Sequence, residues 1–136
     1  MRSVLVDSGF VVALGIERDP RHRAARRFLG SYAGELLVPA PVVCESCFFL
    51  SIAGKVRLLD WVGSPPRRVL ELPESAYPEV GRILARYADL DADFTDAAIV
   101  WLAEKTGYRT MLTVDVRDFS AFRLARGRRF ELVNWS

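Results

Sequence analysis

Residues 4–14 read V-L-V-D-S-G-F-V-V-A-L, an apolar run that a carboxylate interrupts at Asp7. The pattern predicts a short buried strand from Ser3 to Asp7 and a helix directly after it. An unpaired carboxylate taken out of water costs several kcal/mol. Three further acids stand in apolar sequence in the same way: Glu45, Asp96 and Asp115. A cation bound by all four acids is the simplest explanation for carboxylates in apolar sequence. The pattern therefore predicts a metal-dependent enzyme.

Short apolar segments alternate with helical segments along the chain. Further strands are expected at 35–38, 68–72, 110–114 and 130–133, and helices at 10–17, 20–31, 39–52, 56–61, 74–87 and 94–106. Asp19-Pro20 supplies an N-cap for the second helix. The alternation predicts one α/β domain over residues 1–136. We expect a mostly parallel sheet of about five short strands, flanked by helices on both faces.

The composition is that of an ordinary globular domain, with 136 residues, 51% of them hydrophobic and 26% charged. The least charged stretch, residues 36–54, contains two prolines and Glu45, so it is a poor membrane span. The first residues lack the pattern of a signal peptide. We therefore expect a cytoplasmic protein without membrane attachment.

The net charge is only +2, but all except two of the 19 basic residues are arginine. They cluster at 18–27, 67–68 and 123–129. The planar guanidinium suits phosphate recognition, which makes nucleic acid a credible partner. A GC-rich genome and solvated helix faces explain any one cluster equally well.

The four acids are expected to meet at one edge of the sheet. Asp7 and Asp115 each end an apolar strand, and Asp96 starts a helix, so all three belong to the edge where parallel strands end. Each acid also has a structural alternative: Asp7 as a helix cap, Asp115 as a turn residue, and Glu45 as a surface residue. Asp93 and Asp96 stand one helical turn apart, and we favour Asp93 as the cap.

Oxygen ligands predict a hard cation, Mg²⁺ or Mn²⁺. A zinc site is disfavoured because His22 is the one histidine, and Cys44 and Cys47 are the two cysteines. Their C-x-x-C spacing also occurs in redox proteins. We expect them instead to be two buried structural thiols.

Four motifs carry a family resemblance: V-L-V-D-S-G-F-V-V-A-L at 4–14, V-V-C-E-S at 42–46, D-F-T-D-A-A-I-V-W-L-A-E-K-T-G at 93–107, and L-T-V-D-V-R-D-F at 112–119. In combination they resemble the PIN-domain ribonucleases, and among these the VapC-type toxins of bacterial toxin–antitoxin pairs. Ser8 stands where a threonine is more common in the family, but it retains the hydroxyl.

The resemblance implies a parallel-sheet fold and endonucleolytic cleavage of RNA with Mg²⁺ or Mn²⁺. By motif, Asp7 and Asp96 would be the primary metal ligands, and Asp115 would ligate directly or through water. Glu45 would orient the attacking water or complete a second metal position. Asp93 and Asp118 are near enough to act as auxiliary acids. Of the three clustered residues Asp91, Asp93 and Asp96, we assign Asp96 as the acid of the metal site. Family members often dimerise and are silenced by an antitoxin, so a homodimer and a cognate antitoxin are expected partners.

Two other functions compete with this interpretation. Phosphoryl transfer to an aspartate would require a second Asp two residues after Asp7, or a lysine after a late strand, and the sequence has Gly9 and no such lysine. A PIN-like domain that binds RNA or a partner without catalysis is the second alternative. Retention of all four acids argues against it.

Overall fold

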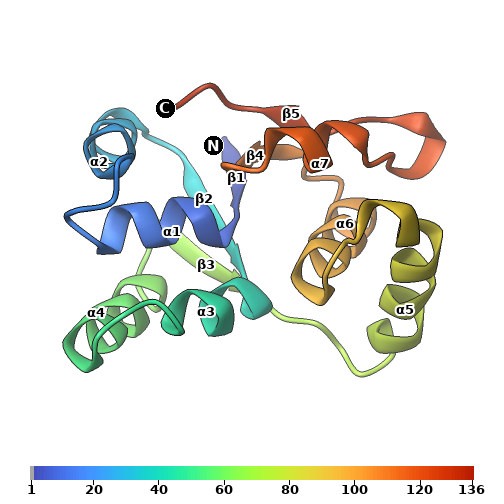
Figure 1. The fold of residues 1–136 in the computed structure, drawn as a ribbon, viewed down its shortest axis with the longest axis horizontal. Helices are drawn as coiled ribbons and strands as arrows, with labels where there is room; N and C mark the ends of the chain where they lie inside the picture. The colour runs from blue at the N-terminus through green and yellow to red at the C-terminus, as the bar shows by residue number, and fades with distance from the viewer. Residues whose placement is uncertain (1) are drawn as a thin grey trace.

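The computed structural model describes residues 2–136, which contain one five-stranded sheet (Figure 1). Its strands are β1 (Ser3–Val6), β2 (Glu35–Pro39), β3 (Arg67–Leu70), β4 (Thr110–Leu112) and β5 (Glu131–Leu132). The order across the sheet is β3-β2-β1-β4-β5, and every neighbouring pair is parallel. The expected fold class is confirmed, and the sheet is parallel throughout.

Helices cover both faces of this sheet. They are α1 (Ser8–Gly15), α2 (His22–Ser31), α3 (Ala40–Cys47), α4 (Ile52–Val62), α5 (Ala76–Arg86), α6 (Phe94–Thr106) and α7 (Val116–Ala121), with 3₁₀ turns η1 (Ala88–Leu90) and η2 (Ala125–Gly127). Figure 1 shows α1, α2 and α4 on one side of the strands and α5 and α6 on the other. Helix α3 contacts both α1 and α6, so it joins the two layers.

The middle of the chain differs from the sequence expectation. The single helix expected at 39–52 ends at Cys47, and α4 starts at Ile52. The Ser51 side chain caps α4 by accepting a hydrogen bond from the Gly54 N–H at 3.1 Å. A serine cap favours a new helix start, which explains the break. Near the amino terminus, Asp19 accepts from the Arg21 N–H at 2.8 Å, and α2 begins later than expected, at His22.

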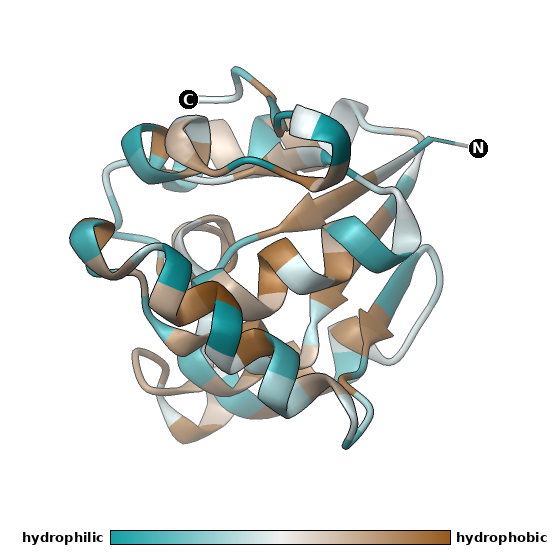
Figure 2. Cartoon of the chain, turned by 90° about the vertical axis from the view of Figure 1, so that its right-hand side faces the viewer, coloured by the Kyte–Doolittle hydropathy of each residue, from teal (hydrophilic) through white to brown (hydrophobic). Residues whose placement is uncertain are grey.

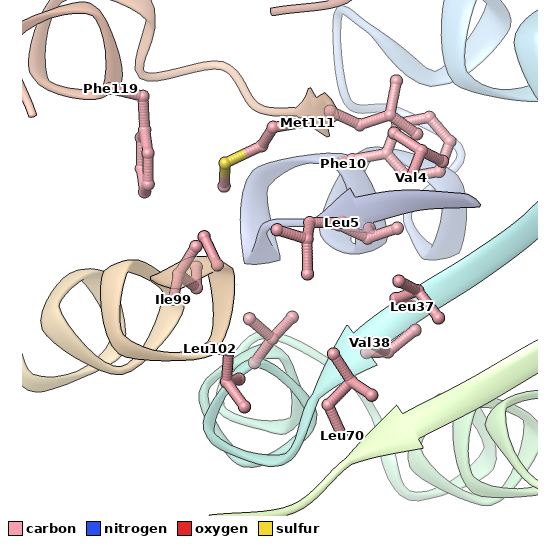
Figure 3. Close-up of a cluster of buried hydrophobic side chains, with 14 of the residues drawn as sticks. Val4, Leu5, Phe10, Leu37, Val38, Leu70, Ile99, Leu102, Met111 and Phe119 are labelled. Atoms are coloured by element: carbon pink, nitrogen blue, oxygen red, sulfur yellow. The ribbon is translucent and has the colours of Figure 1, made fainter. Parts of the chain in front are cut away.

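The core lies between the sheet and the helices. Leu5, Leu37 and Met111 come from neighbouring strands, and Figure 3 shows Ile99 of α6 and Phe119 of α7 turned toward them. Figure 2 shows the apolar strands inside and hydrophilic stretches on the outer helices. Burial of each large apolar side chain contributes roughly 1.5–3 kcal/mol. None of the helices in residues 2–136 has the length and apolar character needed to cross a bilayer.

The strand order places a topological switch point beside β1. The chain adds β2 and β3 on one side of β1 and then crosses over to add β4 and β5 on the other. In open α/β sheets, ligands bind at such a point, outside the carboxyl ends of the strands. Asp7 directly follows β1, and Asp115 follows β4 after a short segment, so both acids lie at this edge.

Candidate active site

Asp7 is buried at the junction of β1 and α1, with 7% of its surface exposed. Its Oδ1 atom accepts a hydrogen bond from the Ser8 N–H at 2.8 Å, which caps α1. Its Oδ2 atom accepts from the Thr113 hydroxyl at 2.9 Å. Burial raises the pKa of Asp7 to about 6, against the lowering effect of these two hydrogen bonds. Asp7 therefore caps α1, as the structural alternative proposed, and its other oxygen is held by Thr113 from the segment that follows β4.

Glu45 bridges the two layers of helices from its position on α3. Its Oε1 atom accepts from the Ser8 hydroxyl of α1 at 2.5 Å, and its Oε2 atom accepts from the Thr95 hydroxyl of α6 at 2.9 Å. Glu45 is half-buried, so it is not the surface residue of the alternative interpretation. The contacts that α3 makes with α1 and α6 bring this carboxylate to the edge where Asp7 lies.

Asp96 lies in the first turn of α6 and forms a capping box with Asp93. The Asp93 carboxylate accepts from the Asp96 N–H at 2.8 Å, and the Asp96 carboxylate accepts from the Asp93 N–H at 3.2 Å. Asp93 is the N-cap, as expected. Burial raises the pKa of Asp96 to about 7, with further raising contributions from the charges of Asp93 and Asp7. Asp91 lies outside this group, in an exposed left-handed turn before α6.

Asp115 caps α7 by accepting from the Asp118 N–H at 3.3 Å. No helix was expected over residues 116–121, and this cap explains why the short helix α7 forms there. The Asp115 N–H donates to the Thr113 hydroxyl at 2.9 Å. Burial raises the pKa of Asp115, and the Asp118 charge raises it further.

The acids are therefore joined by two chains of hydrogen bonds. Thr113 links Asp7 to the backbone of Asp115, and Glu45 links Ser8 to Thr95, the neighbours of Asp7 and Asp96. The structure brings all four predicted acids to one edge. The hydroxyl of Thr113 was not singled out from the sequence. Its position in L-T-V-D, two residues before an acid, is the signal that would have identified it.

The local charge is negative. Within residues 2–136, none of the four acids forms an ion pair with arginine or lysine. The donors are oxygen atoms, which suit a hard cation. The same residues hold no group of three or more side chains already converged as a metal-ligand set. Magnesium keeps several waters and is usually held by one or two carboxylates, so the donor set fits such an ion without a closed protein cage.

The two cysteines flank Glu45 on α3. Cys47 is half-buried, but Cys44 is exposed, so the expectation of two buried thiols is wrong for Cys44. The helix is apolar around Glu45, yet one of its faces is turned to solvent, which the sequence pattern did not indicate.

The model of the PIN-domain family matches residues 4–124, which include all four acids. The chain belongs to the PIN-domain family. It is 27% identical over 134 residues to Ribonuclease VapC26 of Mycobacterium tuberculosis, and the match covers 96% of this chain and 99% of that protein. This resemblance agrees with the VapC-type motifs in the sequence.

Three solved structures share the fold. VapC20 of Mycobacterium tuberculosis, described as a sarcin-ricin loop cleaving toxin, superposes with a TM-score of 0.77 at 22% identity, covering 84% of this chain and 91% of that one. A toxin–antitoxin complex from Klebsiella pneumoniae gives 0.64 at 12% identity, with 98% of each chain covered. VapBC2 from Rickettsia felis, bound to a promoter DNA fragment, gives 0.67 at 11% identity, with 99% and 100% covered. These three likenesses establish the fold of the PIN domain.

Proposed function

We propose that this PIN domain is an endoribonuclease that uses Mg²⁺ or Mn²⁺ to hydrolyse RNA phosphodiester bonds, and that it is the toxin of a toxin–antitoxin pair. The observation that carries the proposal is the buried Asp7 carboxylate beside Glu45 and Asp96 with no basic partner in residues 2–136. The resemblance of this chain to Ribonuclease VapC26 supports RNA as the substrate.

In this proposal Asp7 and Asp96 would hold the cation, with Asp115 as a direct or water-mediated ligand. A bound cation of this kind lowers the pKa of water and stabilises charge on phosphate oxygens. The Thr113 hydroxyl fixes the Asp7 carboxylate, and the capping box fixes the backbone around Asp96. Glu45 would orient the attacking water, because a carboxylate that accepts two hydroxyl hydrogen bonds retains further lone pairs. A second metal position at Glu45 is the alternative role.

The partners belong to the proposal as well. The toxin–antitoxin complex from Klebsiella pneumoniae and VapBC2 from Rickettsia felis share this fold, which supports an antitoxin as the cognate protein. Helix α4 and the segment before it expose large apolar side chains, which supports a protein partner, antitoxin or second copy. These side chains are Phe48, Phe49, Ile52, Val56 and Leu59.

Cleavage of labelled RNA by the purified protein tests the enzyme directly. We expect cleavage with Mg²⁺ or Mn²⁺ and none with EDTA. Asp7→Asn and Asp96→Asn should each lower the rate of cleavage strongly. The decrease should exceed the roughly 10- to 100-fold that is typical when a residue that only orients a metal ligand is replaced. Asp89→Asn, on the exposed η1 turn, is the matched control and should retain activity. Cleavage that persists in EDTA would refute the metal mechanism.

A further inference from the structure

Arginines line the amino-terminal edge of the sheet, opposite to the acids. Because the five strands are parallel, the residues that precede or begin them lie at one edge. Ladder hydrogen bonds place two of these residues, since the Glu35 N–H donates to the Arg2 carbonyl at 2.7 Å and the Glu131 N–H donates to the Arg109 carbonyl at 2.8 Å. Together with the start of β3 and the turn before β5, this edge carries Arg2, Arg67, Arg68, Arg109, Arg126, Arg128 and Arg129, here called the amino-edge arginines.

Three of the amino-edge arginines have a structural role. The Arg67 guanidinium donates to the Trp61 carbonyl at 2.9 Å, near the end of α4. Arg68 pairs with Glu35 at 3.2 Å. Arg109 pairs with Glu131 at 3.0 Å, and it also donates to the Arg129 carbonyl at 3.0 Å, which ties the turn before β5 to the strand beside it. Capping and ion pairing thus account for these three side chains.

The remaining charges have no such explanation. Arg126, Arg128 and Arg129 are exposed, and their side chains form no hydrogen bond or ion pair within residues 2–136. Arg128 lines a small cavity together with Arg109, and Glu104 is the acid there. Arg2 lies 5.7 Å from the centre of the Tyr32 ring. Glu35, Glu131 and Glu104 offset only part of the positive charge, so the edge remains basic.

The acidic edge is a poor place to gain affinity for RNA. Its carboxylates repel phosphates, and none of the four acids is paired with arginine or lysine in residues 2–136. A bound cation offsets this charge locally, but phosphates farther along the RNA gain nothing from it. The binding free energy of a long RNA is therefore expected to come from another surface. The amino edge provides guanidinium groups at the starts of four of the five strands, and from β3 to β5 they span about 19 Å at the usual strand spacing.

We propose that the amino-edge arginines, with Arg126, Arg128 and Arg129 as the main contacts, form a second RNA-binding surface that holds the backbone of a substrate cleaved at the opposite edge. This inference rests on the proposed ribonuclease function. A domain of 136 residues has a radius of gyration of about 14 Å, so a tetranucleotide at the acidic edge does not reach the other side. The surface acts only on longer RNA.

Binding is measured in an Asp7→Asn background, so that the RNA stays intact. The probes are a labelled oligouridylate of about 30 nucleotides, which exceeds one binding module's usual site size, and a tetranucleotide. The variant is Arg126→Gln with Arg128→Gln and Arg129→Gln. Its matched control is Arg82→Gln with Arg86→Gln, on the exposed face of α5. A third protein replaces the same three arginines with lysine, which retains the charge. Thermal unfolding confirms that each protein is folded.

We expect the triple glutamine variant to bind the long RNA at least about tenfold more weakly. The slope of the logarithm of the association constant against the logarithm of the salt concentration should become less steep by about 2, because three phosphate contacts are lost. The lysine variant and the α5 control should stay within about twofold of the parent, and tetranucleotide binding should not change. An equal loss in the α5 control, or no loss in the triple variant, would overturn the proposal. If these binding results hold while the unmodified protein, with Asp7 intact, cleaves no RNA, the RNA-binding surface is supported and the proposed nuclease function fails.

Discussion

The Thr113 hydroxyl donates to the Oδ2 atom of Asp7 at 2.9 Å and joins the segments that follow β4 and β1, at the point where the sheet order reverses. The same hydroxyl accepts from the Asp115 N–H at 2.9 Å. Thr113 is 4% exposed, so water does not readily replace either hydrogen bond. One buried hydroxyl therefore fixes the side chain of one acid and the backbone of another.

Replacement of Thr113 by valine should weaken both the fold and the nuclease. It removes the donor to Asp7 and leaves buried polar groups unpaired, a loss of about 1–3 kcal/mol in the free energy of unfolding. Urea unfolding of the metal-free protein and RNA cleavage rates measure the two effects. Thr110→Val is the control, because the Thr110 hydroxyl makes only a 3.5 Å contact with Glu131 at the opposite edge. Comparable losses in both variants would show that the hydrogen bond from Thr113 to Asp7 contributes nothing specific to stability or to cleavage.

Glu45→Gln should lower the rate of RNA cleavage while the protein remains folded. The amide keeps one oxygen acceptor, but it removes the negative charge and replaces the second acceptor with a donor that faces a hydroxyl. Cleavage should fall by about 100-fold, the lower range for a general base or water-positioning group. The decrease should appear in kcat more than in KM.

Glu104→Gln makes the same chemical change on the last part of α6, near the amino edge. It should leave kcat within about twofold, since it is remote from the acids. A Glu45→Gln enzyme with full kcat would exclude a catalytic part for Glu45.

Asp7→Asn should stabilise the metal-free protein at pH 8. The folded-state pKa of Asp7, about 6, lies above the ordinary value of 3.8, so the folded protein binds more protons than the unfolded chain between these values. The stability that Asp7 contributes at low pH is therefore lost as the pH rises from about 4 to about 6. At pH 8 the ionised carboxylate costs up to about 3 kcal/mol, which asparagine removes.

Thermal unfolding at pH 4 and pH 8, with and without Mn²⁺, measures this effect. Mn²⁺ should raise the melting temperature of the unmodified protein at pH 8, and raise that of Asp7→Asn much less. Asp89→Asn, at an exposed position, should behave like the unmodified protein throughout. A destabilised Asp7→Asn protein at pH 8 would contradict the burial argument.

Gly9→Ala should disturb the site through packing. A Cβ atom at Gly9 would overlap the Cγ2 atom of Val114 and lie 3.2 Å from its Cγ1 atom. Val114 stands between Thr113 and Asp115, so its displacement shifts both. We expect a loss of about 1–3 kcal/mol in stability and a lower cleavage rate. Addition of Val114→Ala should restore much of both.

Gly81→Ala provides the matched control on α5. Apart from its chain neighbours and its own helix backbone, no atom lies within 4 Å of a Cβ at Gly81, and alanine favours an exposed helix by about 0.5–1 kcal/mol. The control should therefore be slightly stabilised. Failure of Val114→Ala to rescue Gly9→Ala would locate the damage elsewhere.

The apolar periodicity predicted most of the fold correctly, because buried parallel strands and amphipathic helices leave clear patterns. It failed where short polar side chains decide the backbone. Ser51 starts a new helix inside an apolar segment, and Asp115 starts α7 where no helix was expected. Such caps depend on one hydrogen bond each, and Ser or Asp in a sequence is equally compatible with a loop.

The sequence by itself determined the fold class and which four acids are out of place in apolar surroundings, because the cost of burying charge depends on residue type and local hydrophobicity. Only the tertiary structure decided how the acids are held. Glu45 meets Ser8 and Thr95 across long separations in the chain, and Asp7 meets Thr113 across the switch point. The same parallel order separates the acids from the amino-edge arginines. These relationships follow from strand order and helix packing, which no local pattern of residues specifies.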